Sequence, residues 1–201
     1  MTHTCATTPA PLLRDDDSAI PDNGPSHFPL GDMVITAFSQ GLANLSGQLD
    51  RADAYARCED RSLQELLDSR LAPDMEPLSK QIALACHQAQ DCLARMLSAP
   101  APCVPLVDTP DMVRDAIDTA LADLWDCDRR VFDAVSRRQL EVKFPYGPII
   151  LLTGLQYVRD WAVPQFYHHL VTAYAILRHQ GVPLGNADRI AHMNRYRRTP
   201  L

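Results

Sequence analysis

The stretch DMVITAFSQGLANLSGQLDRADAYARCE, residues 32–59, carries the pattern that decides the fold class. Its apolar side chains recur at steps of three and four residues, at Phe38, Leu42, Leu45, Leu49 and Ala52. At about 100° per residue these positions fall close to one line, which predicts an amphipathic helix with one buried face. Aspartate favours the N-cap position, so we expect the helix to begin at Asp32 and to end near Glu59.

Two further stripes of the same kind follow. The second covers residues 78–96, and two prolines before it confine its start to the region of Asp74, because proline suits a first turn and not a helix interior. The third covers residues 113–135. Between them, the proline-rich residues 100–105 predict an extended connection, since proline cannot continue a helix.

The last part of the chain predicts one more helical region. Residues 139–148 have no helical period, and we expect an irregular segment with a short extended piece around residues 142–144. The final helical region then covers about residues 149–180, with an interruption or kink near Pro164. Gly181 is expected to close it as a left-handed cap.

Four long amphipathic segments without a convincing strand alternation predict an all-α protein, an up-and-down four-helix bundle around one core. The bundle is expected over residues 32–188 of the 201-residue chain. Residues 1–31 contain five prolines and a run of three aspartates, which predicts a disordered leader. Residues 189–201 contain four arginines, and we expect a solvated basic tail there.

Composition excludes several classes of function. The net charge of -6 argues against a nucleic-acid-binding protein, because binding to DNA or RNA requires many phosphates to be neutralised. No secretory signal is visible, and no apolar run approaches the roughly 18–20 residues of a membrane helix. The six cysteines include no CxxC pair. We therefore expect reduced thiols, a cytoplasmic location and no membrane partner.

Two stretches of the sequence carry a family resemblance. The run PQFYHHLVTAYAILRHQGVPLGNAD, residues 164–188, resembles the family known as domain of unknown function 1993, and LAPDMEPLSKQ, residues 71–81, resembles a second motif of that family. The resemblance covers about residues 33–188 and implies a fold similar to that of the DinB/YfiT-like superfamily of four-helix bundles. Many members of that superfamily bind a divalent metal through three histidines, and some transfer thiol cofactors such as mycothiol or bacillithiol.

The departures from the superfamily concern the metal ligands. Its last helix resembles H-x-x-x-H followed by LR-x-x-G, and counting back from Gly181 places the second histidine at His169 and the first at Gln165. The third ligand should come from the second helix, where the only histidine is His87. That residue lies about 180° from Leu78 on the helical wheel, so we expect it in solvent. A neutral amide is a poor ligand for zinc or nickel, and we expect neither a bound metal nor another cofactor.

Five residues remain as candidates for a pocket. His169 lies at the edge of the apolar stripe, where it is either a pocket residue or a half-buried structural histidine. Gln165, one turn earlier, would reach the same space. Asp74 is either a helix cap or a catalytic acid or base facing His169. Gln81 could line the same cavity, and Tyr174 is either a ligand-binding residue or an ordinary packing aromatic.

Three functional hypotheses follow. The first is a small-molecule-binding bundle, or a metal-free acid/base enzyme, with its pocket around His169. The second is a metal-dependent thiol transferase of DinB type. The third is a non-catalytic interaction module that forms a homodimer, and a homodimer is the expected oligomeric state.

Overall fold

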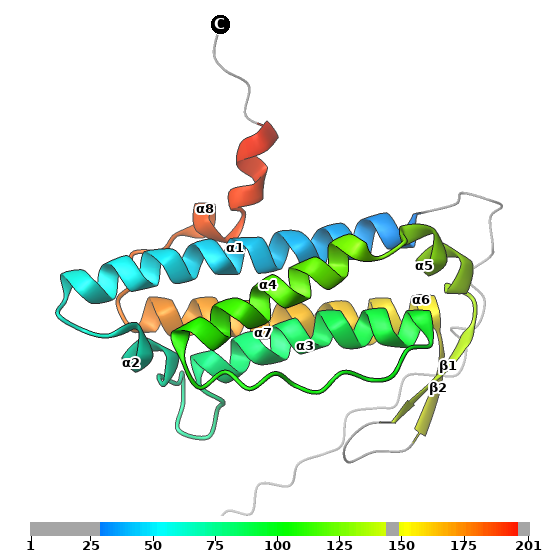
Figure 1. Ribbon diagram of the computed structural model, residues 1–201, viewed down its shortest axis with the longest axis horizontal. Coiled ribbons are helices and arrows are strands. Elements are labelled where there is room, and N and C mark those ends of the chain that lie inside the picture. The colour runs from blue at the N-terminus through cyan, green and yellow to red at the C-terminus, as the bar shows by residue number, and fades with distance from the viewer. Residues whose placement is uncertain (1–28, 144–148, 197–201) are drawn as a thin grey trace, which may run out of the picture.

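The computed structural model describes residues 29–143 and 149–196. Four long helices lie side by side and form a bundle (Figure 1), namely α1 (Leu30–Cys58), α3 (Leu78–Leu97), α4 (Pro110–Asp126) and α7 (Val163–His179). The predicted helix bundle is confirmed. The leader up to residue 28, residue 144 of the expected extended piece and residues 197–201 of the tail lie outside the described residues.

Helix α1 begins at Leu30, two residues before the predicted start, and ends at Cys58, close to the prediction. Asp32 is therefore not the N-cap. It lies in the first turn, and its Oδ1 atom accepts a hydrogen bond from Arg129 Nη1 at 2.8 Å. Aspartate is favourable in the first turn as well as at the N-cap, because a carboxylate there complements the helix dipole. The presence of Asp32 therefore does not show at which residue the helix begins.

Helix α2 (Leu63–Leu67) is short and begins with a capping box between Ser62 and Glu65. Helix α3 begins at Leu78 and not near Asp74, which is exposed in the turn before the helix. The physical reason is Pro77, which holds the N-cap position of α3 and disfavours helical backbone at the residue before it.

The proline-rich segment after α3 is a long crossover. It runs back along the bundle, so that α4 begins at the same end as α3 and the two helices are parallel (Figure 1). At the end of the crossover, Thr109 caps α4 by accepting a hydrogen bond from the Met112 backbone N–H at 3.3 Å. In a strictly up-and-down bundle a short loop would join α3 to an antiparallel α4. Here the connection between α3 and α4 is a long crossover, as in some other four-helix bundles.

The segment after helix α5 (Arg129–Val135) is a β-hairpin. Strand β1 (Gln139–Lys143) pairs antiparallel with β2 (Ile149–Thr153), and Val142 lies opposite Ile150. The prediction of helix from residue 149 was wrong. A run of five apolar and β-branched residues is too short to distinguish strand from helix by its period, and pairing with β1 decided the outcome.

The last helical region therefore begins after β2. Thr153 and Gln156 form a capping box that starts α6 (Gly154–Tyr157), and a π-helical segment, η1 (Val158–Ala162), joins α6 to α7. Pro164 is the second residue of α7, which follows the π-helical segment directly, so the α-helix is interrupted beside this proline as predicted. Gly181 has a φ of +90°, which confirms the predicted left-handed cap.

Two short elements follow α7. Helix α8 (Asn186–Arg189) lies beside α1, and the 3₁₀ helix η2 (Ala191–Tyr196) stands off from the bundle (Figure 1). Among the described residues, no helix has the length and hydropathy that crossing a lipid bilayer would require.

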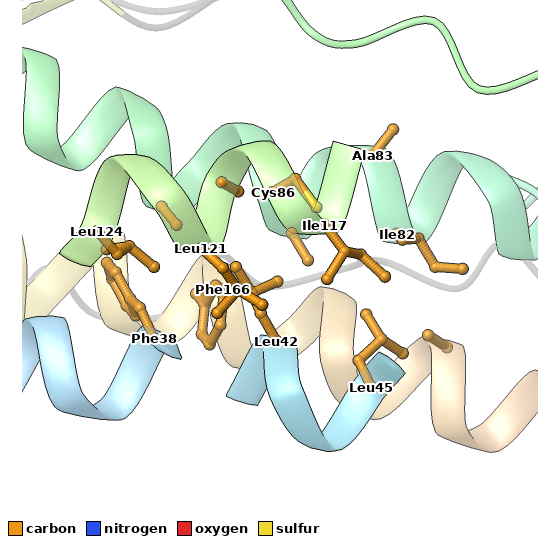
Figure 2. Close-up of a cluster of buried hydrophobic side chains, with 14 of the residues drawn as sticks. Phe38, Leu42, Leu45, Ile82, Ala83, Cys86, Ile117, Leu121, Leu124 and Phe166 are labelled. Atoms are coloured by element: carbon orange, nitrogen blue, oxygen red, sulfur yellow. The ribbon is translucent and has the colours of Figure 1, made fainter. Parts of the chain in front are cut away.

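The core lies between the four long helices (Figure 2). Phe38 on α1 faces Phe166 on α7, and their ring centroids are 4.4 Å apart. The stripe predicted for α1 is buried along its whole length. Other side chains that meet in the same cluster include Leu42, Leu45, Ile82, Cys86, Ile117, Leu121 and Leu124.

Candidate functional site

A hydrogen bond joins the two neighbouring helices α3 and α7 at the predicted site. The Nδ1 atom of His169 lies 2.9 Å from Oε1 of Gln81, although 88 residues separate them in the sequence. The Nε2 atom of Gln81 donates to the backbone carbonyl of Glu76 at 3.4 Å. This second contact orients the amide, so its oxygen faces the imidazole. An amide oxygen only accepts, and His169 therefore carries its proton on Nδ1.

The other ring nitrogen of His169 is left with a lone pair. Its Nε2 atom makes no hydrogen bond with the described residues, and the His169 side chain is half-buried. The pKa of His169 is lowered to about 4, mainly by burial and to a smaller extent by charge repulsion from the nearby His168 and His87. At pH 7 the imidazole is therefore neutral, with Nε2 as a hydrogen-bond acceptor.

The remaining candidates are less closely connected to His169. Gln165 is half-buried one helical turn earlier, and Tyr174 is half-buried and packs against the core. The carboxylate of Asp74 is exposed and makes no hydrogen bond with the described residues. The structure thus brings Gln81 and His169 into contact, keeps Gln165 and Tyr174 on the same helix as His169, and does not join Asp74 to them.

The prediction that His87 lies in solvent was wrong. Its side chain is half-buried, and Nδ1 is sealed from solvent without a hydrogen-bond partner among the described residues. Burial lowers its pKa, while Asp91 and the backbone of Cys103 raise it. Cys103 belongs to the crossover, which covers this side of α3. A helical wheel places a residue relative to its own helix only, so it could not reveal this cover.

A cleft lies on another face of the molecule. It has a volume of about 530 Å³, lies between α1, α7 and the C-terminal segment, and does not include His169. Its lining is mostly apolar, with Asn44 and Gln48 of α1 and His192 of η2 among the polar residues. The sequence analysis predicted a pocket around His169 and did not predict this cleft.

Asn44 positions the C-terminal segment against this cleft. Its Nδ2 atom lies 2.9 Å from the carbonyl oxygen of Arg189 and 2.9 Å from Nδ1 of His192, and its Oδ1 accepts from the His192 backbone N–H at 3.2 Å. Part of the expected solvated tail is therefore attached to α1. Asn44 and Gln48, two polar residues one turn apart beside the apolar stripe, were the signal that could have indicated a second polar site.

The sequence and the structure of this chain are similar to those of known proteins. Residues 30–190 match the family described as Domain of unknown function (DUF1993). The chain belongs to the DUF1993 family. This DUF1993 chain is also similar to the crystal structure, at 1.83 Å resolution, of a DinB family member protein from Shewanella denitrificans. The sequence identity is 31%, the TM-score is 0.74, and the match covers 85% of this chain and 96% of that one. No curated protein matches. The predicted resemblance is confirmed.

The residues of this DUF1993 chain do not fit the three-histidine metal site of the superfamily. In the described part of the chain, no three His, Cys, Asp or Glu side chains lie close enough to hold one ion. The residue that meets His169 from α3 is the amide of Gln81, and its oxygen is already engaged by Nδ1. Zinc and nickel prefer imidazole or thiolate, so the neutral amides of Gln81 and Gln165 are poor donors beside His169, and Nδ1 of the nearby His87 is sealed from solvent.

Proposed function

We propose that this DUF1993 protein is a small-molecule-binding bundle whose site is centred on His169, where Nε2 accepts a hydrogen bond from the ligand. The proposal depends on one observation, the connected pair of hydrogen bonds from the Glu76 carbonyl through Gln81 to His169. These contacts determine both the tautomer and the direction of the ring before any ligand arrives.

An acceptor oriented in advance favours binding for a physical reason. A ligand that meets an ordered side chain does not lose the free energy of immobilising it, and a partly desolvated acceptor forms a stronger hydrogen bond than one in open water. Gln165, one turn before His169, offers a second amide on the same helix. The ligand class that fits is a neutral molecule with a hydroxyl or N–H donor, because a neutral acceptor attracts no ionic group strongly.

The same observations favour binding over acid/base catalysis. A general base is most effective when its pKa is close to the working pH. With a pKa of about 4, His169 is a weak proton acceptor at pH 7. We leave Asp74 out of the proposed site because its exposed carboxylate has no contact that directs it toward His169. A metal-dependent thiol transferase would require a donor set that Gln81 and His169 do not supply.

Nuclear magnetic resonance of ¹⁵N-histidine-labelled full-length protein tests this proposal. We expect the His169 ring to be protonated on Nδ1 and to remain neutral down to about pH 5. Phenol, benzamide and indole serve as neutral donor probes. At least one of them should shift the Nε2 resonance of His169, and the shift should saturate as the probe concentration rises.

Matched variants identify the atom responsible. His169→Asn should abolish probe binding, and Gln81→Leu should weaken it because the ring loses its orienting partner. His168→Asn is the control, since His168 is the exposed neighbour of His169 on the same helix. An Nε2–H tautomer in the parent protein would contradict the proposal. Equal probe affinity in the parent and in His169→Asn would contradict it as well.

A further inference from the structure

The cleft between α1, α7 and the C-terminal segment has the size of a small-molecule site. Its volume of about 530 Å³ lies within the range of roughly 300–1,000 Å³ that is typical of ligand pockets. Arg189, Ile190 and His192 form its third side, which we call the C-terminal wall. Asn44 holds this wall through its hydrogen bonds to Arg189 and His192. The cleft is therefore bordered on three sides by described residues of one chain.

The lining of the cleft is mostly apolar, and much of it is exposed. Met33 on α1, Tyr167 and Val171 on α7, and Ile190 in the C-terminal wall all line the cleft and are all exposed. Exposed apolar side chains that gather in this way, with polar residues around them, are typical of a binding surface. Covering them is favourable in proportion to the apolar area removed from water. We therefore expect the body of an occupant to be apolar.

His192 can offer such an occupant a hydrogen-bond donor. The Oδ1 atom of Asn44 accepts from the His192 backbone N–H at 3.2 Å, so the other amide atom, 2.9 Å from Nδ1 of the ring, is the nitrogen Nδ2. Because Nδ2 only donates, Nδ1 of the neutral ring is the acceptor and the ring proton is on Nε2. Nε2 makes no hydrogen bond with the described residues, and the half-buried side chain lines the cleft. His192 thus has the opposite polarity to His169, whose free ring nitrogen accepts.

The charge at the C-terminal wall favours an anionic group. Arg189 lines the cleft there, and its guanidinium donates to the neutral amide of Asn186 at 3.0 Å but pairs with no carboxylate of the described residues. The adjacent carboxylate of Asp188 pairs with Arg51 instead. A guanidinium beside a second N–H donor is a good partner for a carboxylate, because hydrogen bonds between charged groups are the strong ones.

Two other polar residues of the lining do not oppose this preference. Asp32 lines the cleft near the start of α1, and its carboxylate already accepts a hydrogen bond from Arg129 at 2.8 Å. Asp32 also lies twelve residues before Asn44, which is about 18 Å along a helix, so it is distant from the C-terminal wall. The Oε1 atom of Gln48 is sealed from solvent, so it takes no part in binding.

We propose that the cleft binds a small carboxylic acid with an apolar body. The body lies against Met33, Tyr167 and Val171, and the carboxylate lies beside Arg189 and accepts from Nε2 of His192. A medium-chain fatty acid is the simplest molecule with this chemistry. The site is separate from His169, which does not line the cleft and calls for a neutral donor. Failure of either proposal therefore leaves the other intact.

Methyl nuclear magnetic resonance of the full-length chain tests this site, with octanoate as the probe. The methyl resonances of Val171 and Ile190 should shift, and the shift should saturate as the octanoate concentration rises. Octan-1-ol and octylamine carry the same chain without the carboxylate. Each should bind at least about tenfold more weakly than octanoate, because the charge-assisted hydrogen bonds at the C-terminal wall are lost.

Two variants remove the partners of the carboxylate. Arg189→Gln and His192→Phe should each raise the octanoate dissociation constant about tenfold. Their affinity for octan-1-ol should stay within about twofold of that of the parent, because the apolar lining remains. Octan-1-ol therefore reports whether the cleft itself is intact. Arg195→Gln is the control, since Arg195 is exposed in the same C-terminal segment and does not line the cleft.

Four results would overturn the proposal. The first is the absence of a saturable shift at Val171 and Ile190, and the second is equal affinity of the parent for octanoate and octan-1-ol. The third is an equal loss of octanoate binding in Arg195→Gln and Arg189→Gln. The fourth is a dimeric chain that Val171→Asp converts to a monomer and whose cleft methyls octanoate leaves unchanged, which would assign the cleft to a second copy.

Discussion

Gly41 on α1 lies directly against Phe166 on α7. A Cβ atom at position 41 would lie 2.7 Å from Cε1 of the Phe166 ring and 2.7 Å from Cδ1 of Leu170. The absence of a side chain thus allows the two helices that border the cleft to approach each other, and this contact leads to the first prediction.

Gly41→Ala should destabilise the protein although alanine is the better helix former. Replacing glycine inside a helix gains up to about 1 kcal/mol, but overpacking a core contact costs about 1–3 kcal/mol. We expect a net loss of about 1 kcal/mol in the free energy of unfolding, measured by urea denaturation. Gly47→Ala is the matched control on the same helix, because nothing lies within 4 Å of its Cβ, and it should stabilise the protein by roughly 0.5–1 kcal/mol. The same sign for both changes would contradict this account of the α1–α7 contact.

Tyr157→Phe should destabilise the protein, because it removes a buried hydrogen bond. The Tyr157 hydroxyl donates to Oδ2 of Asp91 at 3.0 Å inside the core, and Arg95 Nε donates to the same oxygen at 2.6 Å. A buried hydrogen bond to a charged group contributes about 2 kcal/mol, which corresponds to a fall of roughly 4–8 °C in Tm for a domain of this size. Differential scanning calorimetry measures this change. Tyr167→Phe, at an exposed tyrosine, should shift Tm by no more than about 1–2 °C. Equal shifts would mean that the hydroxyl bond contributes nothing.

The stability of the protein should fall as the pH drops from 7 to 4. The pKa of His169 is lowered to about 4 in the folded chain, whereas an unfolded histidine titrates near 6.5. Between these values the unfolded chain binds more protons at this site, so acid favours unfolding, and the contribution levels off below pH 4. Allowing for partial solvent screening, we expect roughly 1–2 kcal/mol from this residue.

Urea denaturation at pH 7.5 and pH 5 measures this dependence. His169→Asn should remove part of the difference between the two pH values, because asparagine does not titrate. His179→Asn is the control, since His179 is exposed at the end of α7. If the parent protein and His169→Asn lost the same stability in acid, His169 would not be the residue responsible.

Purified, untagged protein should contain no tightly bound transition metal. Counting back from Gly181 puts Gln165 and His169 at two of the superfamily's ligand positions, and on α3 the amide of Gln81 contacts Nδ1 of His169. Amides bind zinc and nickel weakly. Elemental analysis tests this directly. The double variant Gln81→His/Gln165→His should gain zinc affinity, which would show that the amides and not the fold exclude the ion. About one zinc, nickel or iron per parent chain, lost in His169→Ala, would overturn the prediction.

The structure brings two of the predicted site residues together. Sequence reasoning identified His169 and Gln81 from a family motif and a helical wheel, and the structure joins them by a hydrogen bond of 2.9 Å. Sequence reasoning could not predict that His87 is covered, because the crossover that covers it is distant from it in the sequence. It also could not predict that Asp74 lies outside α3, because the irregular turn before Pro77 has no periodic pattern.

The sequence by itself determined the four helices, because the apolar period that buries one face of a helix is written into that helix alone. It also determined the end of α7, since a φ of +90° at residue 181 is available to glycine at little cost. Only the tertiary structure decided between helix and strand at residues 149–153, because the ladder with residues 139–143 supplies the deciding hydrogen bonds. The low pKa of His169, the attachment of the C-terminal segment to Asn44 and the position of the cleft also depend on the tertiary structure. Each depends on how one helix is rotated against another, and the packing of the whole core sets that rotation.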